Sequence, residues 1–445
     1  MLVFSGDDTV KDSNPVNDSN RRCALIIAYF FPPKPVIGSV RMEGLARYLP
    51  EEGWDVVVLT AKHPGGPDPR FAVYEVDHKH WLRVLESSGQ AVHHAISSRK
   101  SPWLTRLYRW TRSVVEATIC YPDAQRGWYK SAVATGLSII RNRRVDAIIS
   151  TSKPETSHLI ASALCRRAGV PWVADYRDLW TLNHYLSDTN RWLWRVRRVF
   201  ERRLELRTMQ AARAIVTVSD PLARAMRQMF PDKLISSIPN GFDPEIYVRE
   251  GEHSLTQQFT ITYTGTLYGG RRDPSRLFRV VRDLREEGRV NPDILRIRFY
   301  GSEQDVVLTK AKEYNVEAFV EACGRISRLE ALERQRESHV LLSLNWDNDW
   351  EAGVYTGKLF EYLAASRPIL AMGGPGGVVK ELLESTGAGV HVSSVQELRH
   401  VLISWLNEYQ RKGSVSYLGK PEVVEQYSQR AMAVRFKNIL ETVVV

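Results

Sequence analysis

Short apolar runs alternate with segments of helical spacing along the first half of the chain. We predict strands at the apolar runs, which cover residues 23–30, 54–60, 145–152, 170–176, 214–220 and 233–241. The segments between them, such as HLIASALCRRAG, place apolar residues three and four positions apart, as a helix requires. Strands that alternate with helices indicate a parallel sheet with helices on both faces. Residues 61–130 are less regular, and we interpret them as an insertion.

A second alternating set follows a polar joint at residues 243–258. Its apolar runs predict five more strands, at residues 259–265, 294–301, 316–324, 339–345 and 368–372. This repeat favours an α/β protein with two Rossmann-like, doubly wound domains over one large sheet. We therefore predict a disordered tail over residues 1–20, an N-terminal domain over 21–248, a C-terminal domain over 255–425 and a final amphipathic helix over 426–445.

The composition is that of an ordinary globular protein. Hydrophobic residues make up 43% and charged residues 25% of the 445 positions, and no apolar run is long enough to span a bilayer. The N-terminus lacks the basic start and the apolar core of a signal peptide. Four widely separated cysteines without a CxxC motif favour a reduced, cytoplasmic protein without structural zinc.

The net charge of +10 predicts an anionic partner or a tolerant surface. Residues 97–115 contain five basic residues, two tryptophans and no acid, and residues 191–207 are rich in arginine and carry Trp192, Trp194 and Phe200. If helical, both segments suit the interface of an anionic membrane, such as the inner face of the plasma membrane. We find no nucleic-acid recognition motif and predict no such partner. A solvated basic face over a core stripe remains the alternative.

Several loops at predicted strand ends carry candidate chemistry. The first, FPPKPVIGS, lacks the GxGxxG of nicotinamide-binding proteins. The loop GTLYGGRR offers Gly265 for close backbone approach, and Arg271 and Arg272 as guanidinium groups that could bind a diphosphate. The alternative for this loop is a surface turn with a basic tip.

The segment DYRDLW gathers three charges, Asp175, Arg177 and Asp178, where a strand ends. A charged cluster in that position is more typical of a binding site than of a core. His158 stands at the start of the helix after STSKPETS. This histidine could act as an acid or base, or it could simply pack or cap the helix.

The stretch VYTGKLFEYLAASRPILAMGGPGG places Lys358 and Glu361 in the first turns of a helix that otherwise reads as buried. One interpretation is a solvated i,i+3 ion pair at the exposed edge of the helix. The other is a ligand site, in which the helix N-terminus faces an anion and Glu361 holds neighbouring hydroxyl groups.

Five motifs occur in order along the chain: FFPPKPVIGSVRMEGLARYLPEEGWDVVVLT, TSKPETSHLIASALCRRAGVPWVADYRDLW, IPNGFD, YTGTLYGG and KLFEYLAASRPIL. Together they resemble the GT-B glycosyltransferases, in particular glycosyltransferase family 4, from about residue 22 to residue 440. The resemblance implies two Rossmann-like domains facing across a cleft, with a nucleoside-diphosphate sugar in the C-terminal domain and the acceptor in the N-terminal domain. It also implies that the final helix returns to the N-terminal domain. No metal or cofactor is expected, because helix N-termini and basic side chains neutralise the diphosphate.

The resemblance also implies roles for single residues. Glu361 corresponds to the second acid of the family's two-glutamate motif, which contacts the donor's ribose. The position of the first acid is Gly353, with Glu351 two residues earlier, and Thr266 stands where many members have arginine. We predict donor binding by Gly38, Gly265, Thr266, Arg271, Arg272, Tyr355, Thr356, Gly357, Lys358 and Glu361. The predicted catalytic residues are Asp178, Arg177 and His158.

The predicted function is transfer of a sugar from a nucleotide donor to a glycan or a lipid-linked acceptor, with retention at the anomeric carbon as the family implies. Such a reaction belongs to polysaccharide or glycoconjugate biosynthesis. Two alternatives remain, because a fold alone does not give a function. One is a nucleotide-sugar 2-epimerase of the same architecture, and the other is a binding protein that has lost catalysis.

Overall fold

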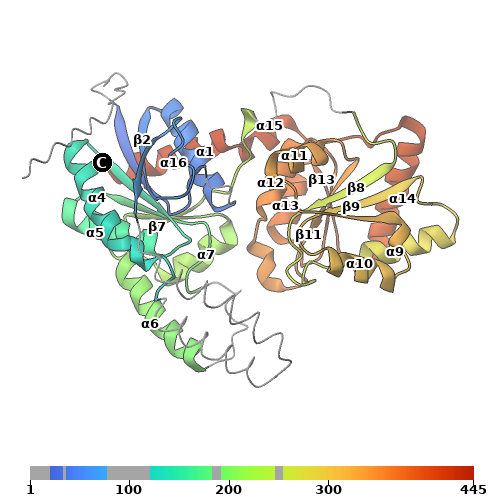
Figure 1. Cartoon of the computed structure of the whole chain (residues 1–445), viewed down its shortest axis with the longest axis horizontal. Coiled ribbons are helices and arrows are strands. Elements are labelled where there is room, and N and C mark those ends of the chain that lie inside the picture. The colour runs from blue at the N-terminus through green and yellow to red at the C-terminus, as the bar shows by residue number, and fades with distance from the viewer. Residues whose placement is uncertain (1–20, 34–36, 78–120, 183–191, 246–253, 445) are drawn as a thin grey trace, which may run out of the picture.

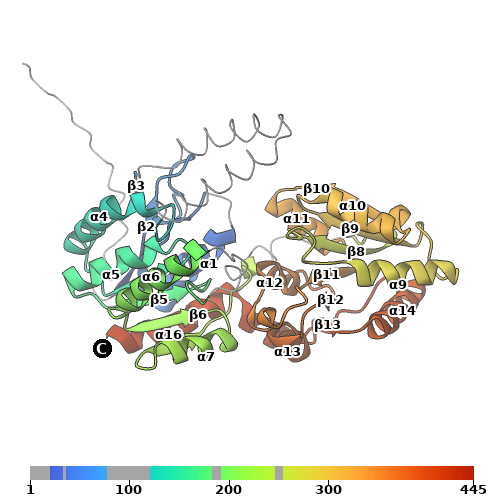
Figure 2. The same cartoon turned by 90° about the horizontal axis from the view of Figure 1, so that it is seen from below.

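The computed structural model describes residues 21–33, 37–77, 121–182, 192–245 and 254–444. It contains two sheets, of seven and six strands, and every strand pair in both is parallel. Helices cover both faces of each sheet, and the two domains lie side by side (Figures 1 and 2). The prediction of an α/β protein with two doubly wound domains is confirmed.

The N-terminal sheet has the strand order β3-β2-β1-β4-β5-β6-β7. Its central strands are buried on both faces and therefore read as continuous apolar runs. Leu25 of β1 pairs with Val57 on one side and Ile148 on the other. The strands are β1 (Arg22–Ile27), β2 (Trp54–Ala61), β3 (Ala72–Val76), β4 (Ala147–Thr151), β5 (Trp172–Tyr176), β6 (Ala214–Thr217) and β7 (Leu234–Ser237).

Two apolar clusters fill the two faces of this sheet. Helices α4 (Tyr129–Asn142), α5 (Thr156–Ala168) and α7 (Asp220–Met229) contribute to one, with α6 (Trp192–Met209) outside α5. Helix α1 (Ile37–Tyr48) and the C-terminal helix α16 (Gln429–Val444) contribute to the other. The chain thus returns to the N-terminal domain at its end. Gly44 makes room for this return, because a Cβ atom there would lie 2.4 Å from the Gln429 side chain.

The C-terminal sheet has the order β10-β9-β8-β11-β12-β13. Its strands are β8 (Phe259–Thr264), β9 (Leu295–Tyr300), β10 (Val320–Gly324), β11 (Val340–Leu344), β12 (Ile369–Met372) and β13 (Gly389–Val392). Helices α9 (Ser275–Glu286), α10 (Gln304–Glu313) and α14 (Val395–Lys412) pack on one face. The other face carries α11 (Arg328–Arg336), α12 (Gly357–Ala364), α13 (Gly377–Thr386) and α15 (Pro421–Val424).

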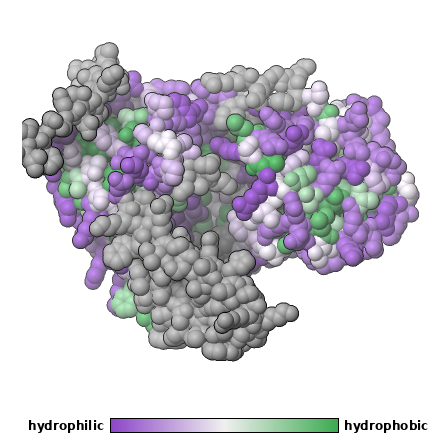
Figure 3. All heavy atoms as spheres, in the orientation of Figure 1, coloured by the Kyte–Doolittle hydropathy of each residue, from purple (hydrophilic) through white to green (hydrophobic). Residues whose placement is uncertain are grey.

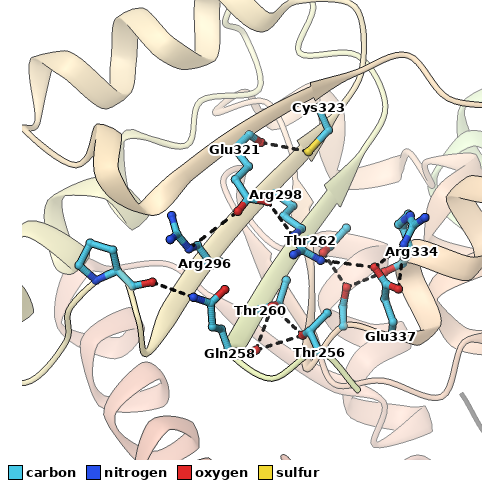
Figure 4. Close-up of polar contacts among 12 residues, drawn as sticks. Thr256, Gln258, Thr260, Thr262, Arg296, Arg298, Glu321, Cys323, Arg334 and Glu337 are labelled. Atoms are coloured by element: carbon cyan, nitrogen blue, oxygen red, sulfur yellow. Dashed lines mark hydrogen bonds and ion pairs between the residues drawn. The ribbon is translucent and has the colours of Figure 1, made fainter. Parts of the chain in front are cut away.

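A charged network fixes α11 on the sheet (Figure 4). Arg298 of β9 forms ion pairs with Glu321 of β10, at 2.8 Å, and with Glu337, at 3.4 Å. Arg334 of α11 also pairs with Glu337, at 2.9 Å. Ion pairs that share partners restrain one another, so the network joins the C-terminal end of α11 to β9 and β10.

Two strands, β3 and β13, were missed in the sequence analysis. β3 is a half-exposed edge strand, so the interpretation of residues 61–130 as an insertion is wrong for residues 72–76, which pair with β2. β13, with the sequence GVHV, is the opposite edge of the second sheet and is only partly buried. Edge strands lack the continuous apolar run that burial on two faces imposes.

The surface seen in Figure 3 is mostly hydrophilic, with small hydrophobic areas on both domains. In the part of the chain that the structure describes, no helix combines the length and the apolar character that crossing a membrane requires. The segment 191–207 falls mainly on α6, whereas the segment 97–115 and the tail 1–20 lie outside the described residues.

Candidate functional site

The C-terminal sheet reverses its strand order between β8 and β11. Ligands of doubly wound sheets bind beyond the carboxyl ends of the strands at such a switch point. The loop after β8 contains residues 265–272, and the loop after β11 leads to the start of α12 at Gly357. The two loops touch, since the Arg271 guanidinium lies 4.8 Å from the centre of the Trp346 ring. This edge of the sheet is therefore the first place to seek a ligand site.

The Lys358 ammonium is buried here, although the residue as a whole is only half-buried. Its Nζ atom has no hydrogen-bond partner among the described residues and lies 3.4 Å from the centre of the Tyr263 ring. Gly265 leaves space beside it, because a Cβ atom there would lie 3.7 Å from Nζ. Burial, and then the nearby Arg272, hold the pKa of Lys358 well below its usual value. Glu361 opposes this shift only in part, and a buried ammonium without a hydrogen-bond partner indicates a place for an anion.

Arg272 supplies a second positive charge to the same place. Its side chain is buried, and the guanidinium lies 4.7 Å from the centre of the Tyr268 ring. Burial raises the pKa of Tyr263 to about 12, and Arg272 opposes this rise through its charge and a hydrogen bond. Among the described residues neither Arg272 nor Lys358 forms an ion pair. Two cations thus flank Tyr263 without a compensating carboxylate salt bridge.

Backbone N–H groups of the glycine-rich loop, residues 265–272, already bind a carboxylate group of the protein itself. The N–H groups of Leu267, Tyr268 and Gly269 donate to the carboxylate of Glu303, at 2.5, 2.9 and 2.5 Å. Sequence reasoning missed Glu303, which follows β9 and is distant in the chain. Because these donors are used, contacts from this loop to a diphosphate fall to its side chains, above all to Arg272.

The N-terminus of α12 completes the anionic site. Thr356 is the N-cap residue, and its Oγ1 atom is buried without a hydrogen-bond partner in the described residues. Gly357 begins the helix and is exposed. Free backbone N–H groups and the helix dipole give this end a positive potential that favours phosphate. Lys358 and the N-terminus of α12 therefore both favour an anion at this edge of the C-terminal sheet.

Glu361 does not pair with Lys358, as the first interpretation of this helix required. Nε of Arg328 instead donates a hydrogen bond of 3.0 Å to the Oε1 atom of Glu361, and the two residues form an ion pair. Arg328 is the first residue of α11, the helix held by the network of Figure 4. The Glu361 side chain is half-buried, with 23% of its surface exposed. Sequence reasoning missed Arg328 because its partner lies 33 positions away.

Three other predicted donor residues have different surroundings. Thr266 is exposed, and its backbone oxygen accepts a hydrogen bond of 2.8 Å from the Tyr263 hydroxyl. Tyr355 packs against Phe360, with ring centres 5.5 Å apart. Gly38 lies in the N-terminal domain, near the start of α1, where a Cβ atom would be 2.8 Å from Arg177. Gly38 thus borders the predicted acceptor side, and its donor role stays a prediction.

The position of the family's first acid lies at the contact between the domains. Ser219, just before α7, donates a hydrogen bond of 2.6 Å to the backbone oxygen of Gly353. A Cβ atom on Gly353 would lie 3.1 Å from Pro221, so a glutamate there would crowd α7. Glu351 is itself 3% exposed. The departure from the family pattern therefore coincides with close packing of the two domains.

The predicted acceptor-side charges separate in space. Arg177 and Asp178 form an ion pair of 2.7 Å in the loop after β5. Asp175 turns away and forms a buried ion pair of 2.9 Å with Arg41 of α1, which ties β5 to that helix. The structure therefore leaves Arg177 and Asp178 as the pair that remains accessible at this strand end.

His158 lies in the first turn of α5, and its side chain is fully buried. Its Nδ1 atom is 2.7 Å from the Ser150 hydroxyl, and its ring lies 4.9 Å from that of Tyr176. Burial lowers the pKa of His158 to about 3, so the ring stays neutral at physiological pH. This position favours the packing role that the sequence left open, while the catalytic role stays a prediction.

Comparison with known proteins adds to this geometry. Residues 38–241 match the model of the glycosyl transferase 4-like domain. No curated protein sequence matches the chain. The solved structures that share the fold include three that are each 13% identical to this chain. Sucrose-phosphate synthase from Thermosynechococcus elongatus has a TM-score of 0.56, with 95% of this chain and 99% of that chain covered.

The second structure is Anabaena HepE in complex with UDP and glucose, with a TM-score of 0.58 and coverage of 95% of this chain and 100% of that chain. The third is WaaG, a glycosyltransferase involved in lipopolysaccharide biosynthesis, with a TM-score of 0.54 and coverage of 94% and 99%. These matches extend over both domains. The predicted GT-B fold is confirmed, and the family model confirms the resemblance to glycosyltransferase family 4 over residues 38–241.

Proposed function

Because the chain carries a glycosyl transferase 4-like domain on a GT-B fold, we propose that it is a glycosyltransferase. It takes a sugar from a nucleoside diphosphate bound at the switch point of the C-terminal sheet. It transfers that sugar to a hydroxyl group of a glycan or a lipid-linked acceptor held by the N-terminal domain. The pathway is the synthesis of a polysaccharide or a glycoconjugate.

One observation carries the donor site: the buried Lys358 ammonium has no hydrogen-bond partner among the described residues and lies at the N-terminus of α12. Arg272 adds a second buried cation across Tyr263. A diphosphate would supply the negative charge that this place lacks. HepE, whose solved structure is a complex with UDP and glucose, supports the same ligand class for this fold.

The chemistry follows from the charges. As the bond between the sugar and the diphosphate breaks, negative charge accumulates on the leaving oxygen. Lys358, Arg272 and the N–H groups of α12 are placed to stabilise that charge, which lowers the barrier. Glu361 binds the ribose hydroxyls, and Arg328 holds its carboxylate in place. We propose that the reaction needs no metal ion or cofactor and retains the anomeric configuration.

The acceptor approaches from the N-terminal domain, where Arg177 and Asp178 are our candidate contacts. Helix α6 supports a lipid-linked acceptor at the inner face of the plasma membrane. Its Val199 and Phe200 side chains are each 53% exposed. Arg197 pairs with Glu201, at 2.6 Å, but the neighbouring exposed arginines, Arg195, Arg202 and Arg203, remain available to anionic headgroups.

The 2-epimerase and the binding protein remain alternatives, because the chain has Gly353 in place of a glutamate at the first position of the two-acid motif. A 2-epimerase would need several acids and bases around the sugar, and a binding protein would need none. Product analysis separates the three. A transferase releases the nucleoside diphosphate, an epimerase converts one nucleotide sugar into another, and a binding protein leaves the nucleotide sugar intact.

The experiment is a screen of nucleoside diphosphates by thermal unfolding, followed by incubation with the matching nucleotide sugars. A ligand that binds the native state raises its unfolding temperature by mass action. We expect one nucleoside diphosphate to do so, and its sugar derivative to be cleaved with release of that diphosphate. Absence of stabilisation by every nucleoside diphosphate would overturn the proposal.

A further inference from the structure

The N-terminal sheet has a switch point of its own, between β1 and β4. A cavity of about 380 Å³ opens there, within the ~300–1,000 Å³ range of small-molecule sites. Its walls come from the carboxyl ends of three neighbouring strands and from α6. They include Phe30 after β1, Lys153 and Glu155 after β4, Trp180 after β5, and Arg197 and Glu201 on α6.

The formal charges that line this cavity cancel, since three are acidic and three are basic: Asp123, Glu155 and Glu201, with Lys153, Arg197 and Arg198. Lys153 lies 3.8 Å from Glu155, and Arg197 lies 2.6 Å from Glu201. Arg198, also on the wall, donates a hydrogen bond of 3.0 Å to the backbone oxygen of Thr181. This contrasts with the C-terminal site, where two cations lack carboxylate partners among the described residues. The N-terminal cavity therefore suits an uncharged ligand better than a phosphate.

Glu155 is the polar group best placed to recognise such a ligand. The residue is 7% exposed and lines the cavity, and its contact with Lys153 is too long for a hydrogen bond. Burial, together with the charge of Asp123, raises the pKa of Glu155 to about 7. Near neutral pH the carboxyl group is thus present in both forms, and it can accept a hydrogen bond from a hydroxyl group or donate one to it.

We propose that this cavity binds one uncharged sugar ring of the acceptor, with the Glu155 carboxyl group hydrogen-bonded to a ring hydroxyl. The inference rests on the proposed function, which places the acceptor in this domain. It adds the class of group that the acceptor presents, namely a neutral carbohydrate and not a phosphate. It also adds a specificity-determining residue that lies outside the site residues of the sequence analysis.

The test uses the full chain and saturation-transfer NMR with methyl glycosides of glucose, galactose, mannose and N-acetylglucosamine. Glucose 6-phosphate serves as the charged comparison. We expect at least one neutral glycoside to bind, and to bind more tightly than glucose 6-phosphate. Titration with the best nucleoside diphosphate is recorded separately, so that loss of the donor site and loss of this cavity can be told apart.

Three variants locate the glycoside. Glu155→Ala should weaken its binding by roughly tenfold or more, the usual effect of losing a hydrogen bond to a charged group. Glu155→Gln, which keeps a hydrogen-bonding side chain, should retain part of the affinity. The control is Glu205→Gln, because Glu205 is equally buried on α6, with its pKa also raised to about 7 by burial, but contacts Tyr176 and Thr181.

The Glu205 variant should bind the glycoside as the parent protein does, and all variants should keep the affinity for the nucleoside diphosphate. The proposal is overturned if no glycoside binds, if glucose 6-phosphate binds more tightly than every neutral glycoside, or if both Glu155 variants bind like the parent. The Gln variant keeps the test decisive should the Ala variant fail to fold.

Discussion

Replacing Lys358 by methionine should weaken nucleotide binding and at the same time stabilise the ligand-free protein. The two effects have one cause, which is an ammonium group buried without a hydrogen-bond partner among the described residues. The diphosphate satisfies this group in the complex, and nothing comparable among those residues does so in the free protein. Methionine has a similar length and no charge, so it fills the same space beside Tyr263.

The magnitudes follow from the contacts. A hydrogen bond to a charged group contributes about 1.5–3 kcal/mol, so the affinity should fall by about 10- to 150-fold. An unsatisfied buried polar group costs about 1–3 kcal/mol, and the contact with the Tyr263 ring recovers only part of it. Burial, and then the charge of Arg272, lower the pKa of Lys358, so the folded protein disfavours the charged ammonium. The free energy of unfolding should therefore rise by roughly 1 kcal/mol at pH 7.

The pH dependence of the stability tests the same reasoning independently, because the direction of the change can be predicted. Because the folded-state pKa of Lys358 is depressed, the unfolded chain binds more protons than the folded chain between that depressed pKa and the usual lysine pKa. The stability of the parent protein therefore rises with pH over that range, relative to the variant. The advantage of Lys358→Met should shrink as the pH approaches 10.5.

Calorimetric titration gives the affinity, and urea unfolding without nucleotide gives the stability. Lys412→Met is the matched control, since Lys412 is exposed on α14 and pairs only with Glu408 among the described residues, at 3.0 Å. It should change neither quantity by much. A Lys358 variant that loses stability and keeps its affinity would show that the ammonium is a structural group, and would refute the reasoning.

Three further predictions follow from other parts of the molecule. Glu155→Gln should reduce the loss of stability between pH 5 and pH 8 by on the order of 3 kcal/mol. Burial raises the pKa of Glu155 to about 7, so the folded chain binds more protons than the unfolded chain in this range. Urea unfolding at both pH values measures the difference. Turnover should persist in a chelator, and its loss with rescue by magnesium or manganese would contradict metal independence. Replacing Val199 and Phe200 by serine should reduce sedimentation with anionic vesicles without changing nucleotide affinity, and a parent protein that ignores such vesicles at low salt would contradict the membrane proposal.

The buried strands of both sheets could be predicted from the sequence because burial on two faces leaves a continuous apolar signal. Strand β5 is buried at every position, and it was found within two residues of its true start. The edge strands β3 and β13 carry no such signal, since solvent reaches part of each. Their place in the sheets depends on pairing with a neighbour, which periodicity cannot reveal.

The candidate site was predictable where one short segment carries it. The segment from Thr356 to Glu361 contains the helix N-terminus, the lysine and the glutamate together. Partners from distant parts of the chain were not predictable, and Arg328 and Glu303 belong to this group because only the fold brings them to Glu361 and to the glycine-rich loop. His158 illustrates a different difficulty, since a residue type suited to catalysis lies in the core.

The central claim is that a nucleoside diphosphate binds at the switch point between β8 and β11. Hydrogen exchange with and without the best-binding nucleoside diphosphate tests it most directly, because backbone N–H groups at the start of α12 would gain a partner. The account predicts slower exchange in peptides covering residues 263–272 and 354–361. Protection confined to the N-terminal domain, with no change in these two segments, would contradict it.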